Sequence, residues 1–254
     1  MIRKSLLVAI CATLITGCAT KTVVPPIAQE LNQAVIRKIT KVEVFYHPAE
    51  FAVVDLGGSG AAGMAGILGP VGMLIALGMD ASSKLTFKQR VEARSKQFDA
   101  AVKTSSLSDV NLLQAEYLAQ AIRRTGREAR ISKIERPLGG DAKAMAMGLG
   151  WKPADDHAGM VVRTTVGYGA ESATASYKSI AINDFLLTDA DGKTLAFGRA
   201  QRKDNGVTYQ TFSGLLESHK TAVNSLTQDL IRNADEAMKK TLDLASFEPA
   251  GKAQ

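Results

Sequence analysis

The chain of 254 residues carries 31 basic and 25 acidic side chains, a formal net charge of +6 at pH 7. The basic residues form no long block, which argues against a nucleic-acid-binding protein. A hydrophobic fraction of 46% is enough for a buried core in one or two domains, so a wholly disordered chain is also excluded.

The N-terminus, MIRKSLLVAICATLITGCAT, has the form of a secretory signal. Arg3 and Lys4 provide a basic start, and residues 6–15 are an apolar run too short for a permanent membrane span. The run ends in Ile15-Thr16-Gly17-Cys18, which resembles the lipobox of bacterial lipoproteins, where an aliphatic and two small residues precede an obligatory cysteine. The alternative is an ordinary cleaved signal with an incidental cysteine.

The lipobox resemblance implies that residues 1–17 are removed and that Cys18 carries a diacylglycerol and an N-acyl chain such as palmitate. Ala19, which is not aspartate, implies sorting to the outer membrane. Without Arg3, Lys4 and Cys11, the mature chain has 29 basic and 25 acidic residues and no cysteine pair for a disulfide. We expect a tether over residues 18–38 and an α/β periplasmic domain over 39–250, with no cofactor beyond the lipid.

The first elements after the tether are two strands. Residues 27–38 have the composition of a short helix, and Lys41–Tyr46 (KVEVFY) alternates apolar and polar residues as a half-buried strand does. Pro48 ends that strand, and residues 51–56 form a second β-prone run.

A glycine-rich apolar segment, residues 56–79, follows without a single charge. Its Gly58-x-Gly60-x-x-Gly63 pattern matches the dinucleotide-binding fingerprint, with Asp80 near the position of a ribose-binding carboxylate. A helix after that fingerprint would contain further glycines and Pro70, at about 1 kcal/mol per glycine and about 3 for the proline. Dinucleotide binding is therefore the least favoured interpretation.

A role in membrane insertion or self-association explains the composition of residues 56–79 better than dinucleotide binding does. Twenty-four uncharged residues can cross a bilayer once or form a helical hairpin, and small residues allow close helix contact. The segment resembles in kind that of the TraT family of surface-exclusion lipoproteins. The alternative is a glycine-rich loop that folds onto its own domain. The expected contact residues are Gly60, Gly63, Gly66, Gly69 and Gly72.

Two helices and a strand are predicted next. Residues 84–103 are charged and helical, and residues 108–126 form a second helix with Ser108 as N-cap and Gly126 at the C′ position. Residues 129–134 alternate as a strand. The predicted buried stripe of the second helix is Val110, Leu113, Tyr117, Leu118, Ala121 and Ile122.

The C-terminal part is predicted as strands closed by a helix. After a Gly/Ala/Met-rich region with a short helix at 141–147, strands cover 159–166, 177–187 and 194–202, the last two joined by a turn at 189–192. A final helix covers 221–242, with Val223, Leu226, Leu230, Ala234, Ala237 and Thr241 on one face. The run FLLTDADGKTLAF followed by this helix resembles the module of the curli-secretion-channel lipoproteins and the TolB N-terminal domain family. The expected fold class is α+β, a mixed or antiparallel sheet with packed helices.

No catalytic constellation is evident. Asp155-Asp156-His157 contains metal-ligand types, but three consecutive residues seldom converge on one ion, so we expect a solvated loop and no metal site. The run Asp189-x-Asp191-Gly192 does not match the pattern of a calcium-binding loop and is predicted to be a turn. No G-x-S-x-G motif occurs. His47 and His219 are expected to be surface histidines, and the protein is expected not to be an enzyme.

These patterns together indicate a lipid-anchored cell-envelope protein at the outer membrane, with a structural, assembly or binding role. We expect it to contact the membrane through Cys18 and to form a homo-oligomer, or to bind an envelope protein, but not to bind nucleic acid. The alternative is a monomeric periplasmic accessory lipoprotein that binds a partner protein.

Overall fold

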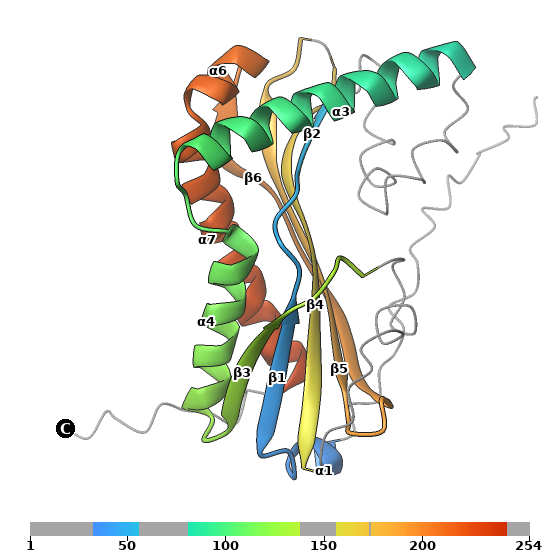
Figure 1. Cartoon of the computed structure of the whole chain (residues 1–254), viewed down its shortest axis with the longest axis vertical. Coiled ribbons are helices and arrows are strands. Elements are labelled where there is room, and N and C mark those ends of the chain that lie inside the picture. Colours follow the sequence, from blue (N-terminus) through green and yellow to red (C-terminus); the bar gives the residue numbers. More distant parts are fainter. Residues whose placement is uncertain (1–32, 56–80, 138–155, 173, 243–254) are drawn as a thin grey trace, which may run out of the picture.

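One mixed sheet organises the molecule. The computed structural model describes residues 33–55, 81–137, 156–172 and 174–242 (Figure 1). Within these ranges the strands pair in the order β3-β1-β4-β5-β6, and β2 also pairs with β4. The strands are β1 (Lys41–Tyr46), β2 (Phe51–Asp55), β3 (Glu128–Lys133), β4 (His157–Ala170), β5 (Tyr177–Thr188) and β6 (Thr194–Tyr209).

The sheet has a parallel and an antiparallel half. β1 runs parallel to both β3 and β4, and β2 runs parallel to β4. β4, β5 and β6 form an antiparallel meander. The turn predicted between β5 and β6 is confirmed, because Asp189 N–H donates to the Lys193 carbonyl and Gly192 has a φ of 78°. The α+β class with a mixed sheet is likewise confirmed.

The longer helices cover one face and one end of the sheet. α4 and α7 lie against each other on one face, and α3 runs along β2 at one end (Figure 1). None of the described helices is long and apolar enough to cross a membrane. The glycine-rich segment 56–79 and the helix predicted at 141–147 lie outside the described residues. The helices are α1 (Gln33–Ile36), α3 (Ala81–Thr104), α4 (Val110–Arg124), α6 (Phe212–Glu217) and α7 (His219–Thr241).

The core lies between the sheet and these helices. The stripe predicted for the last helix is confirmed, since all six of its residues are buried on α7. Under α3, Phe98 contacts Phe51 edge-on with ring centroids 5.4 Å apart, and Tyr168 lies 6.1 Å from Phe98. Phe98 therefore fastens α3 to β2 and β4. On the opposite face of the sheet, Phe45, Val161 and Leu186 form a smaller apolar cluster.

The predicted N-cap of α4 was wrong by one position. Asp109, not Ser108, is the N-cap, and its carboxylate accepts hydrogen bonds from the N–H groups of Asn111 and Leu112. The buried face includes Asn111 and Gln114, while Leu113, Tyr117 and Ala121 are only half-buried. Val110, Leu118 and Ile122 of the predicted stripe are buried as expected. The two amides were missed because the stripe was assigned by apolarity, whereas the Asn111 and Gln114 amide nitrogens donate to the carbonyls of His47 and Leu230 inside the protein.

β6 extends beyond its predicted end at residue 202. The run Asp204-Asn205-Gly206 has the composition of a turn, and positive φ values at Asp204 and Gly206 (59° and 86°) confirm a local reversal. The pairing of β5 with β6 shifts at this point, so these residues loop out as a bulge and the strand resumes to Tyr209. The short helix α6, which was not predicted, follows and is capped by the Thr211 hydroxyl.

Candidate binding groove at the break between β1 and β2

β1 and β2 are two parts of one interrupted strand. Tyr46 is paired with Val162 and Phe51 with Val166, so the four linker residues 47–50 lie opposite the three residues 163–165 of β4. The extra residue makes this linker a bulge. Pro48 has no N–H to contribute to a strand ladder, which explains why the interruption occurs here.

At the interruption, the His47 side chain takes the place of a backbone carbonyl as hydrogen-bond partner of β4. Its Nε2 accepts a hydrogen bond from the Thr164 N–H at 3.0 Å, so Nδ1 carries the proton and donates to the Pro48 carbonyl at 2.9 Å. The residue is 1% exposed, which corrects the expectation of a surface histidine. Burial, followed by the charge of Arg136, lowers the pKa of His47 to about 4. With both ring nitrogens engaged, this neutral imidazole is a structural group and not a general base.

Side chains from α3 and α4 bind the other backbone edge of the linker and of β2. The Asp109 carboxylate accepts the Ala49 N–H at 3.1 and 3.2 Å in addition to capping α4. Asp99 accepts the Phe51 N–H at 3.2 Å, and the Ser95 hydroxyl accepts the Val53 N–H at 2.9 Å. Burial raises the pKa of Asp99, and the Phe51 N–H opposes that shift. The linker is thus held from both sides by side chains.

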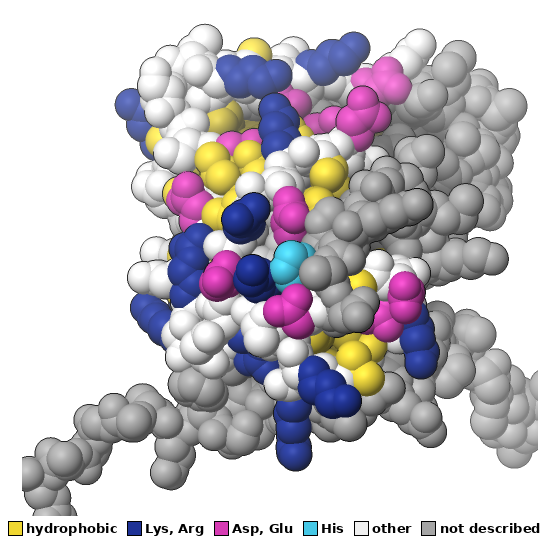
Figure 2. Space-filling model, turned by 60° about the horizontal axis from the view of Figure 1, so that its bottom comes forward, with side chains coloured by type: hydrophobic (Ala, Val, Ile, Leu, Met, Phe, Trp, Pro, Cys, Tyr) yellow, Lys and Arg dark blue, Asp and Glu magenta, His cyan; other side chains and the backbone are white. Residues whose placement is uncertain are grey.

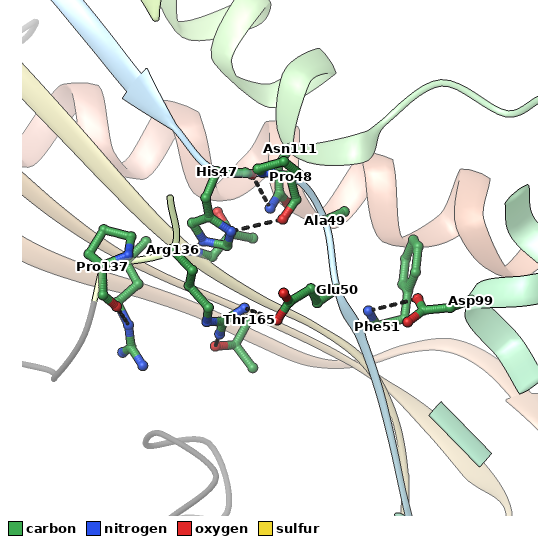
Figure 3. A network of polar contacts seen from close by, with 12 residues as sticks. His47, Pro48, Ala49, Glu50, Phe51, Asp99, Asn111, Arg136, Pro137 and Thr165 are labelled. Atoms are coloured by element: carbon green, nitrogen blue, oxygen red, sulfur yellow. Dashed lines mark hydrogen bonds and ion pairs between the residues drawn. The ribbon is translucent and has the colours of Figure 1, made fainter. Parts of the chain in front are cut away.

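A surface groove of about 500 Å³ opens beside this linker. Arg136 extends along it and donates from Nη2 to the Thr165 hydroxyl at 3.0 Å (Figure 3). Its Nη1 lies 3.7 Å from the Glu50 carboxylate, beyond hydrogen-bond distance. The groove is lined by His47, Pro48, Glu50, Lys133, Ile134, Glu135 and Arg136.

A buried charge cluster lies next to the groove on the same face of the sheet. Arg199 donates from Nε and Nη2 to the two carboxylate oxygens of Asp184, at 2.6 and 3.1 Å. Arg163 approaches the same carboxylate at 3.4 Å and donates from Nε to the Pro137 carbonyl at 3.1 Å. The side chains of Arg163 and Asp184 are each 3% exposed, so one carboxylate compensates two guanidinium groups within the sheet.

Arg136 adds a third positive charge close to this cluster. Burial, then the like charge of Arg163, lowers the pKa of Arg136, and Glu50 only partly opposes the shift. On the face shown in Figure 2, basic and acidic side chains are interspersed. The groove lining itself has two basic and two acidic residues, and the neighbouring Arg163, Arg199 and Asp184 add one net positive charge.

The other candidate residues do not form a site in the part of the chain that is described. Cys18, Asp155 and the five glycines from Gly60 to Gly72 lie outside it. Asp156 and His157 lie where β4 begins, with the Asp156 carboxylate 3.6 Å from the His157 Nε2, and Asp156 also accepts a hydrogen bond from the Thr40 hydroxyl. No cluster of three potential metal ligands occurs among the described residues.

His219 is half-buried and contacts residues on two neighbouring segments. Its Nδ1 contacts the Leu216 carbonyl at 2.8 Å, and its Nε2 is hydrogen-bonded to the Ser105 hydroxyl in the turn between α3 and α4. The Ser105 hydroxyl also reaches the Ala101 carbonyl at 2.9 Å. The pair joins α7 to the C-terminal end of α3.

A buried polar network between the sheet and the helices was missed by the sequence analysis. Gln114 donates to the Leu230 carbonyl at 2.9 Å and accepts from Asn183 at 3.0 Å. Asn233 donates to the Asn183 amide oxygen at 2.8 Å, and Thr164 donates to Gln114 at 3.2 Å. The available signal was an amide at each of two positions, 111 and 114, between apolar residues of one helix.

Neither a protein-family profile nor a curated protein sequence matches the chain. Among solved structures, it is similar to PelC from Paraburkholderia phytofirmans, described as a dodecamer, with 13% identity, a TM-score of 0.23, and coverage of 76% of this chain and 88% of PelC. It is also similar to protein XCC0632 of Xanthomonas campestris, of family DUF330, with 9% identity, a TM-score of 0.23, and coverage of 49% and 65%. These TM-scores are too low to bear on function.

Proposed function

We propose that this protein is a lipid-anchored cell-envelope protein with a structural, assembly or binding role. The observation that carries the proposal is the lipobox Ile15–Cys18 behind a basic start and a short apolar run. Several acyl chains on Cys18 anchor a protein much more firmly than a single chain does, at about 0.8 kcal/mol per buried CH₂. Ala19 directs the anchored protein to the outer membrane.

The role of the anchored domain is recognition. The groove beside the β1–β2 linker offers donors for non-covalent binding, and its histidine is fully engaged in structural hydrogen bonds. The uncharged residues 56–79, with glycines at every third position from Gly60 to Gly72, supply a surface for self-association in or at the membrane.

A second candidate role is recruitment of a partner protein by strand addition. Among the described strands, β3 pairs with β1 alone, which leaves its outer edge for an extended peptide. Glu128 and Ile134 donate toward β1, so the alternation of the strand turns the N–H of Lys133 outward. A Lys133→Pro variant should lose such a partner, whereas Lys133→Ala should retain it. Equal capture by the two variants would argue against strand addition.

The lipid anchor is tested by processing in the native host. Globomycin, which blocks cleavage of lipoprotein signals, should cause the uncleaved form to accumulate, and Cys18→Ser should abolish acylation, measured as incorporation of labelled palmitate. Cys11→Ser is the matched control, since it removes a cysteine without touching the lipobox. Normal maturation in the presence of globomycin would contradict the proposal.

A further inference from the structure

Among the described residues, the Arg136 guanidinium has more N–H donors than partners, which leaves donors for a ligand. Within the described ranges it makes one hydrogen bond, to Thr165, and one longer ion pair, to Glu50. A guanidinium has five N–H donors in a planar fork that matches phosphate and carboxylate oxygens. The Arg136 side chain is 27% exposed, so a ligand in the groove reaches it without any rearrangement of the sheet.

Glu50 is a weak partner for this guanidinium. Its side chain is 70% exposed, and the 3.7 Å separation is too long for a hydrogen bond. Exposed pairs of this kind contribute little free energy because water competes for both charges. Glu50 can therefore turn into solvent at small cost and leave its place beside Arg136 to another anion.

The charges around the groove favour an anion more negative than one carboxylate. Arg136, Arg163, Arg199 and Lys133 carry four positive charges, against Asp184, Glu50 and Glu135 with three negative charges. The balance is +1 with Glu50 in place and +2 when Glu50 has turned away. A phosphate group, with one or two negative charges and several acceptor oxygens, fits this balance.

Thr165 adds a neutral donor at the same point. Its hydroxyl oxygen accepts from Arg136, and among the described residues its own proton has no acceptor. The hydroxyl can thus donate to an oxygen that Arg136 also binds, which places a charged and a neutral donor on one ligand. His47, held neutral by its own hydrogen bonds, forms the floor of the groove without adding charge.

We propose that the groove beside the β1–β2 linker is a phosphate-binding site, in which Arg136 and Thr165 bind the phosphate oxygens and Glu50 is displaced. The same chemistry serves a free phosphate and the phosphate of an anionic lipid headgroup. The inference goes beyond lipid anchoring and does not depend on Cys18.

The test measures binding by the full chain carrying Cys18→Ser, in mild detergent for inorganic phosphate and without detergent for vesicles, which detergent would dissolve. The ionic strength is held constant because screening would otherwise obscure the comparison. The probes are inorganic phosphate and vesicles of phosphatidylglycerol, with vesicles of phosphatidylcholine, a zwitterionic lipid without net charge, as the comparison. We expect Arg136→Gln to weaken binding about tenfold or more, and Glu50→Gln to strengthen it by about threefold. Arg232→Gln, an exposed arginine on α7, is the matched control and should leave binding unchanged.

The two probes separate the sources of phosphate. If inorganic phosphate binds, most tightly to Glu50→Gln and most weakly to Arg136→Gln, the site is one for free phosphate. If only phosphatidylglycerol vesicles bind, with the same order of affinities, the site is one for lipid headgroups. Because Glu50→Gln changes an exposed side chain, its effect can be measured even if Arg136→Gln fails to fold. Absence of binding to both probes, equal losses in Arg136→Gln and Arg232→Gln, or weaker binding by Glu50→Gln would overturn the proposal.

Discussion

The two halves of the sheet are held together in different ways. In the meander of β4, β5 and β6, long strands pair through an almost continuous backbone ladder with only local register shifts. In the parallel half, the β1–β2 strand is interrupted, and His47, Asp99, Asp109 and Ser95 take over backbone hydrogen bonds. A regular ladder leaves no space for a ligand, whereas the interruption exposes the groove and places Glu50 and Arg136 beside it. The irregular half of the sheet therefore carries the candidate site.

The close contact between Gly167 of β4 and the Ala52 backbone of β2 should make the stability of the parallel half sensitive to substitution. A Cβ atom on Gly167 of β4 would lie 1.8 Å from the Ala52 carbonyl oxygen, so Gly167→Ala must separate β2 from β4. We expect a loss of about 4 kcal/mol in the free energy of unfolding, measured by chemical denaturation. Gly198→Ala is the control in the meander, because its Cβ would meet only the flexible Lys240 side chain at 3.5 Å. Equal effects of the two variants would contradict the contrast between the halves.

The His47 contact should make stability depend on pH. Its pKa is about 4 in the folded protein, below the ordinary value of 6.5, so the unfolded chain takes up the proton first as pH falls. The stabilising contribution is complete above about pH 6.5 and is lost on acidification toward about pH 4, by about 3 kcal/mol. Urea denaturation across this range should show the loss in the native protein and a smaller one in His47→Gln. The same pH dependence in both would show that other groups cause it.

Asp109 should matter more than an ordinary helix cap. Its carboxylate caps α4 and also binds the linker at Ala49, so Asp109→Ala should cost about 2 kcal/mol of unfolding free energy. Thr211→Ala removes only the cap of the short helix α6 and should cost about 1 kcal/mol. Denaturant unfolding of the two variants gives the comparison. A smaller loss for Asp109→Ala than for Thr211→Ala would mean that the linker does not depend on this carboxylate.

The sequence predicted the elements whose pattern is local. KVEVFY and the stripe of α7 were assigned correctly because strand and helix periodicity are visible within a few residues. The site was not predictable in this way. The contact of His47 with Thr164 joins residues 117 apart, and Arg136 was given no role because nothing in its neighbourhood shows that Glu50 and Thr165 lie beside it. Gln114 was left out of the predicted buried stripe for the same reason, since its buried partners are distant in sequence.

Self-association through residues 56–79 can be measured by the particle size of the acylated protein in mild detergent, with and without residues 57–79. The proposed function predicts an oligomer that becomes a monomer on deletion, while circular dichroism of the α+β domain stays unchanged. A deletion of residues 250–254 is the control and should leave the oligomer intact. A monomer in the undeleted protein, or an oligomer of the same size after the deletion, would contradict self-association through this segment.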